Sequence, residues 1–125
     1  MEPFKKVCLM MFIALTASSA AASETAWKGY LVDRMCADGA KTPAKVKQLC
    51  ETHTKECALD PKCVSSGYTI YSGSKTYIFD DKGNKQAKKL IEASKREDGG
   101  MPVEVKGALS GNTIAVSEIK EVNSP

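Results

Sequence analysis

Four of the five cysteines in this 125-residue chain lie within one short stretch, together with its only histidine. A small domain buries little surface in its core, so a local staple constrains its fold more than any other feature. In an oxidising compartment such a cluster predicts disulfides, and in a reducing compartment it first predicts a metal site. The cysteines are Cys36, Cys50, Cys57 and Cys63, and the histidine is His53.

The N-terminus follows the three-part pattern of an export signal. Two lysines precede an apolar run over residues 7–15, and small residues follow up to Ala22. The run is shorter than the roughly 20 residues that a membrane-spanning helix needs, and no second such run follows. We therefore expect residues 1–22 to be a signal peptide that carries Cys8 away. Residues 23–125 are expected to form one periplasmic or secreted domain.

The rest of the chain alternates between strand-forming segments and turn residues. In these segments β-branched and aromatic residues recur with a period of two. Gly29 predicts a bend in the first segment, and the shifted phase of Ile119 predicts a bulge in the last. The expected strands are residues 27–33, 68–71, 76–79, 103–109 and 113–122.

Two helices are expected between these strands. Thr42 and Pro43 are typical of a helix start, as the capping residue and the first helical residue. Asn84 is expected to cap a second helix over residues 84–95, which Gly99 and Gly100 end. The residues 37–41 and 80–83 are expected to be turns.

The first predicted helix should point the side chains of its cysteines and its histidine in the same direction. Val46, Leu49, Cys50 and His53 lie at positions i, i+3, i+4 and i+7, which is one helical face. If the helix persists, Cys57 continues that face. These side chains would then point toward the body of the protein.

The order of elements predicts a mainly β fold. Five short strands, with one helix before the last hairpin, favour a small five-stranded barrel of the oligonucleotide/oligosaccharide-binding (OB) type with two short helices. In such barrels a helix often plugs the interior between the third and fourth strands, and residues 84–95 occupy that place. The first helix is an insert that carries the cysteine cluster.

Three segments resemble a known group of proteins. They are GYLVD-x2-C (Gly29–Cys36), H-x3-C-x5-C-x2-SG (His53–Gly67) and VEVKGALSGNTIAVSEI (Val103–Ile119). In these segments the chain is similar to small exported bacterial proteins of unknown function, which have an OB-like barrel and a Cys/His-bearing insert. The resemblance implies the same fold and compartment, and it lends no activity.

Disulfides are the first interpretation of the cluster. Four cysteines permit three pairings. Cys50 and Cys57 on one helix would be too far apart to bond each other, because a disulfide needs Cα atoms about 5.5 Å apart. This favours outward pairing of each, with Cys36 and Cys63 in either order. No C-x2-C pair is present, so a thiol-redox role is not favoured.

A metal site is the alternative interpretation. Three thiolates and an imidazole are a known zinc set, and the chain offers it in Cys50, His53 and Cys57, with Cys63 or alternatively Cys36 as the fourth ligand. The soft sulfur ligands also suit copper as Cu(I), with Met35 nearby. Zinc or copper would then be the cofactor of a metal-binding protein.

No pattern in the chain predicts an enzyme. There is no G-x-S-x-G motif and no second histidine to serve as a base. Asp80 and Asp81 lie in a turn-forming stretch, and Asp33 is expected to accept hydrogen bonds in a cap or turn rather than to orient a ligand. The formal net charge of +3 is too small to indicate a nucleic-acid partner.

A non-enzymatic binding or envelope-associated domain is therefore the preferred function. Aromatic side chains on a small barrel can stack against sugars, so an oligosaccharide or an envelope protein is the expected partner. The residues of this expected ligand face are Trp27, Tyr30, Tyr68, Tyr71 and Tyr77.

Overall fold

The computed structural model describes residues 23–125, so the predicted signal peptide, residues 1–22, lies outside the described residues. None of the described helices is long and apolar enough to cross a membrane. The elements in chain order are β1 (Thr25–Asp33), α1 (Arg34–Gly39), α2 (Pro43–Thr52), α3 (Lys55–Ala58), α4 (Pro61–Ser66), β2 (Tyr68–Ser72), β3 (Lys75–Phe79), α5 (Asp81–Ala93), β4 (Pro102–Ser110) and β5 (Thr113–Glu121).

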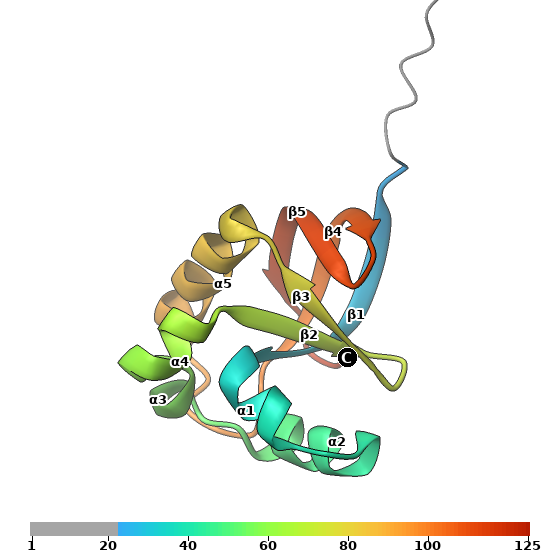
Figure 1. Ribbon diagram of the computed structural model, residues 1–125. Helices are drawn as coiled ribbons and strands as arrows, with labels where there is room; N and C mark the ends of the chain where they lie inside the picture. Colours follow the sequence, from blue (N-terminus) through green and yellow to red (C-terminus); the bar gives the residue numbers. More distant parts are fainter. Residues whose placement is uncertain (1–22) are drawn as a thin grey trace, which may run out of the picture.

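The five strands form one mixed sheet whose hydrogen-bonded order is β1-β2-β3-β5-β4 (Figure 1). The β4 strand also pairs with β1, so the strands close into a ring. Neighbours are antiparallel except for β3 and β5, which run parallel. The five predicted strands are confirmed. The described chain has five helices where two were expected, and helices hold about as many residues as strands, so a mainly β class holds only loosely.

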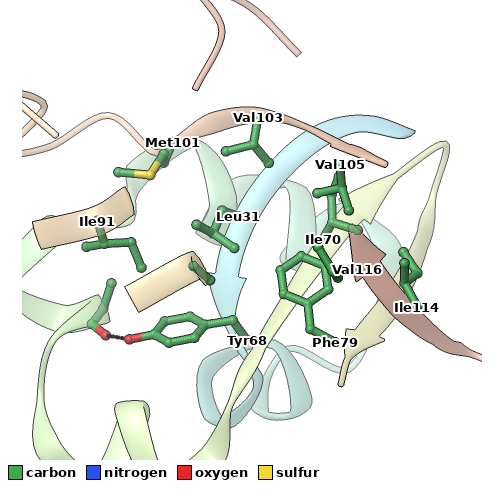
Figure 2. Close-up of a cluster of buried hydrophobic side chains, with 12 residues drawn as sticks. Leu31, Tyr68, Ile70, Phe79, Ile91, Met101, Val103, Val105, Ile114 and Val116 are labelled. Atoms are coloured by element: carbon green, nitrogen blue, oxygen red, sulfur yellow. Dashed lines mark hydrogen bonds between the residues drawn. The ribbon is translucent and has the colours of Figure 1, made fainter. Parts of the chain in front are cut away.

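The main core gathers side chains from all five strands and from α5 (Figure 2). Period-two alternation sends every second side chain of each strand to this side. The Tyr68 hydroxyl is buried here and donates a 2.7 Å hydrogen bond to the Ala58 carbonyl, so α3 is joined to the core. The largest strand residues in the cluster are Leu31, Tyr68, Ile70, Phe79, Val103, Val105, Ile114 and Val116.

A second, smaller cluster lies between the opposite face of β1 and the helices α1 and α2. It contains Val32, Ala37, Val46 and Cys50, all buried. Val32 follows Leu31 in the strand and therefore points to the other side of the sheet. The insert between β1 and β2 thus has a small apolar core of its own.

The first predicted helix begins as expected but ends early. The Thr42 hydroxyl accepts a 3.3 Å hydrogen bond from the Lys45 backbone N–H, and α2 starts at Pro43. The helix ends at Thr52, because His53 is extended (φ −64°, ψ 142°) and the Thr54 hydroxyl caps a new helix, α3. The expectation that one helical face continues to Cys57 is therefore wrong.

Two expected turns are parts of helices instead. The Asp33 carboxylate caps α1, which covers most of the turn expected at residues 37–41. The Asp80 carboxylate accepts a 2.9 Å hydrogen bond from the Gly83 N–H, so α5 starts at Asp81 and not after Asn84. In both cases an aspartate at the end of a strand supplies the cap.

Gly29, where a bend is predicted, lies at a close approach of β1 and β2. A Cβ atom added there would lie 1.9 Å from the Tyr71 carbonyl oxygen. The bulge predicted in β5 is confirmed, because the register shifts between Lys106 and Gly107 and leaves Ser117 as the extra residue.

Gly29→Ala should lower the free energy of unfolding by about 2 kcal/mol, because β1 and β2 must separate to admit the methyl group. Chemical denaturation measures the effect. Gly39→Ala is the matched control, since a Cβ atom at Gly39 meets no atom within 4 Å. Equal stabilities of the two variants would contradict the close approach of β1 and β2 at Gly29.

Candidate metal and thiol site

Asp33 is the centre of the candidate site. It is the last residue of β1 and has 0% of its surface exposed. Its Oδ2 atom accepts a 2.9 Å hydrogen bond from the Cys36 backbone N–H, as the cap of α1. A carboxylate that caps a helix holds the first turn in place. Asp33 therefore fixes the position of Cys36 beside it.

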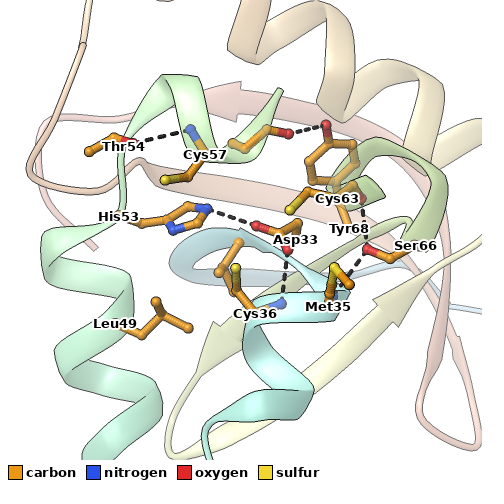
Figure 3. A network of polar contacts seen from close by, with 12 residues as sticks. Asp33, Met35, Cys36, Leu49, His53, Thr54, Cys57, Cys63, Ser66 and Tyr68 are labelled. Carbon is orange, nitrogen blue, oxygen red and sulfur yellow. Dashed lines mark hydrogen bonds and ion pairs between the residues drawn. The ribbon is translucent and has the colours of Figure 1, made fainter. Parts of the chain in front are cut away.

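His53 lies on the other side of this carboxylate (Figure 3). Its Nε2 atom is 2.8 Å from Asp33 Oδ1, and the contact is an ion pair when the imidazole is protonated. Within residues 23–125, neither atom has a hydrogen-bond partner other than this contact. The His53 carbonyl accepts a 3.0 Å hydrogen bond from the Gly100 N–H, which holds the residue in its extended conformation.

Cys63 completes the group from α4. An Asp33 carboxylate oxygen and the sulfurs of Cys36 and Cys63 all lie within 4.8 Å of one another. Asp33 and Cys63 are buried, and Cys36 is partly exposed. Figure 3 shows the three side chains converging from the end of β1, from α1 and from α4. We call this group the Asp33–Cys36–Cys63 site.

Two hydrogen bonds join the helices that carry the two cysteines. The Met35 backbone N–H donates to the Ser66 hydroxyl at 3.1 Å, and the Arg34 N–H donates to the Gly67 carbonyl at 2.9 Å. These contacts link the first turn of α1 to the end of α4. The site is thus held by backbone contacts and not by the side chains of the site alone.

Electrostatics differ between the carboxyl group and the thiols. Burial raises the pKa of Asp33, but hydrogen bonds from His53 and from Cys36 outweigh it, so this pKa lies below its usual value. Burial and the neighbouring Asp33 raise the pKa of the Cys36 thiol to about 12. Burial, followed by Asp33, raises the pKa of Cys63. At neutral pH the site therefore holds one carboxylate and two protonated thiols.

The metal ligands predicted from the sequence do not all lie together in the structure. Cys50 lies on α2 and is buried in the second cluster, and burial raises its pKa to about 12. Cys57 is exposed on α3. Of the predicted ligands, Cys63 and its predicted alternative Cys36 both lie at the site, and His53 contacts Asp33 there. The four described cysteines are free thiols in the structure, so the disulfides stay a prediction.

The expected aromatic ligand face is divided between two sides of the sheet. Tyr68 is buried in the main core with 1% exposed, and the Trp27 and Tyr77 rings pack together against that core with centroids 5.8 Å apart. Tyr30 and Tyr71 face each other across β1 and β2 and pack on the second cluster. A single face of five aromatic residues is therefore wrong, and only Tyr30 and Tyr71 line a common groove.

The space beside His53 is small. His53, Leu31 and Arg96 help to line a cavity of about 20 Å³. A cavity of this size holds about one water molecule. Asp33, Cys36 and Cys63 do not line this cavity.

The thiols should differ strongly in their reactivity in the folded protein. We expect iodoacetamide at pH 8 to modify exposed Cys57 first and Cys36 at least about tenfold more slowly, because the thiolate is the reactive form. Buried Cys50 and Cys63 should react last. Peptide mass spectrometry over time measures the four rates. Equal rates at Cys36 and Cys57 would contradict the placement of Cys36 beside Asp33.

Comparisons of the chain with protein-family models, with curated proteins and with solved structures found no match. The resemblance to small exported bacterial proteins therefore stays a prediction.

Proposed function

We propose that this protein binds one zinc ion at the Asp33–Cys36–Cys63 site. The observation that carries the proposal is the convergence of a carboxylate oxygen and two sulfurs within 4.8 Å, from three different elements. Zinc takes thiolate and carboxylate ligands in tetrahedral sites, so three protein ligands leave a fourth position for water or an external ligand. Binding of the ion is the proposed function, and no catalytic step is proposed.

His53 acts in this proposal as a positioning residue. Its Nε2 atom contacts the Asp33 oxygen that does not cap α1. Groups that hydrogen-bond to a ligating carboxylate orient it and tune the metal. Two thiolates and one carboxylate carry three negative charges against the two positive charges of zinc.

The fold and the compartment belong to the same proposal. The five-stranded ring is proposed to be an OB-type barrel, supported by the position of α5 between β3 and β4 and by its contribution to the main core. The export pattern of residues 1–22 supports a periplasmic or secreted protein. The site lies where β1 leaves the ring and enters the helical insert.

A groove beside Tyr30 and Tyr71 supports a second candidate function, the binding of an oligosaccharide. It has a volume of about 280 Å³ and is also lined by Lys28 and Lys47. Tyrosines can stack on sugar rings, and the groove is large enough for a small ligand. Tyr71→Ala should abolish any such binding and leave zinc binding unchanged.

Competition with a chromophoric chelator tests the zinc proposal. Reduced protein, kept free of oxygen, is titrated with zinc in the presence of the chelator. We expect one zinc ion per chain with a dissociation constant below about 1 μM. Loss of zinc to the chelator without measurable retention would reject the proposal.

A further inference from the structure

We propose that Cys36 and Cys63 form a reversible disulfide, and that this bond and the bound metal ion are mutually exclusive states of one site. The exclusion of the metal rests on the proposed function, whereas the disulfide itself does not. The sequence alone favoured pairs that join Cys36 and Cys63 to Cys50 and Cys57. The structure points to a different pair.

The two sulfurs already lie within 4.8 Å of each other. A disulfide requires about 2.05 Å between them. The helices α1 and α4 that carry them pack together and are joined by the Met35–Ser66 and Arg34–Gly67 hydrogen bonds. Closing the bond requires the two sulfurs to approach each other from this separation, and the packed helices keep them facing each other.

The other two cysteines do not belong to the group of ligand atoms around Asp33. Cys50 is completely buried in the second cluster, and although Cys36 packs against that cluster, the ligand group contains Cys63 and not Cys50. Cys57 is exposed on α3 and does not belong to the group that surrounds Asp33. Oxidation should therefore give one disulfide, between Cys36 and Cys63, and leave two thiols.

Thiol–disulfide exchange with a low-molecular-weight disulfide supplies the oxidation. The Cys36 thiol, which is the more accessible of the two, gives up its proton to solvent, and the resulting thiolate attacks one sulfur of the oxidant. A mixed disulfide forms, and one small thiolate leaves and takes up a proton. The Cys63 thiol then gives up its proton, and its thiolate attacks the Cys36 sulfur and releases the second small thiolate, which is protonated in turn. The protein loses two electrons and two protons, and the oxidant gains both.

The disulfide removes two of the three metal ligands, because it leaves neither sulfur as a thiolate. A bound metal ion has the opposite effect, since it occupies both sulfurs and protects them from exchange. Binding of the ion and closure of the disulfide thus oppose each other at the same two atoms.

Peptide mapping after oxidation tests the pairing. Reduced protein is incubated with oxidised glutathione, with and without one equivalent of zinc, and free thiols are then blocked by alkylation. We expect a cross-link between the peptides of Cys36 and Cys63, with Cys50 and Cys57 alkylated. Zinc should slow the appearance of the cross-link at least about tenfold. Cys57→Ser is the matched control and should behave like the unchanged protein.

The outcomes separate this inference from the proposed function. A cross-link to Cys50 or Cys57, or none at all, would overturn the disulfide even if zinc binds. A Cys36–Cys63 cross-link that forms equally fast with bound zinc would overturn the mutual exclusion. A correct cross-link in a protein that binds no zinc when reduced would reject the proposed function and leave the disulfide standing.

Discussion

Asp33→Ala should lower the free energy of unfolding by about 3 kcal/mol. The substitution removes the cap of α1, which contributes about 1 kcal/mol, and it leaves buried His53 Nε2 without its partner, which costs about 1–3 kcal/mol. Urea denaturation followed by circular dichroism measures the loss. Asp38→Ala is the control, because Asp38 forms only an exposed ion pair with Arg34 and should change stability by less than about 0.5 kcal/mol.

The effect of this carboxylate should depend on pH in a defined direction. Its pKa is lower in the folded protein than in the unfolded chain. The ionised group therefore stabilises the fold fully above its unfolded pKa, and this contribution is lost as the pH falls through the lower folded pKa. The difference in stability between the unchanged protein and Asp33→Asn should shrink below about pH 4. A difference that does not change down to pH 2 would contradict the lowered pKa.

Cys36→Ser and Cys63→Ser should each weaken zinc binding at least about 100-fold. Each change replaces a thiolate ligand with a neutral hydroxyl, which is a poor ligand for zinc. Chelator competition measures the dissociation constants, and circular dichroism checks that the variants fold. Cys57→Ser should bind zinc within about twofold of the unchanged protein, because Cys57 lies outside the group around Asp33.

These variants also distinguish the two ligand sets. The set predicted from the sequence contains Cys50 and Cys57, whereas the Asp33–Cys36–Cys63 site contains neither. If Cys57→Ser weakened zinc binding as much as Cys36→Ser, the ligand set predicted from the sequence would be correct and the Asp33–Cys36–Cys63 site would be wrong.

The strands could be predicted from the sequence because their signals are local. Alternation of β-branched and aromatic residues locates all five, and the phase shift at Ile119 locates the bulge at Ser117. The start of α2 is equally local, since Thr42 and Pro43 carry it. Helix ends are less predictable. The Thr54 hydroxyl caps a new helix, α3, so α2 ends before His53. His53 therefore does not share a helical face with Cys50.

The composition of the site could be predicted only in part. The spacing from Asp33 to Cys36 is a helix-capping pattern, and the expectation that Asp33 accepts a cap hydrogen bond is confirmed. The presence of Cys63 depends on α1 and α4 meeting, which no local pattern specifies. Tyr68 and Tyr71 are three positions apart on β2, so period-two alternation puts them on opposite faces of the sheet, and five aromatic residues on one face were not to be expected.

The absorption spectrum of the reduced protein with one equivalent of Co²⁺ tests the metal site most directly. Cobalt substitutes for zinc, and bonds between cobalt and thiolate sulfur give charge-transfer bands that other ligands do not. We expect these bands to saturate at one Co²⁺ per chain in the unchanged protein and in Cys57→Ser, and to be absent from the Cys36→Ser/Cys63→Ser double variant. A spectrum of hydrated Co²⁺ with the unchanged protein, or bands that persist in the double variant, would contradict a metal site at Asp33, Cys36 and Cys63.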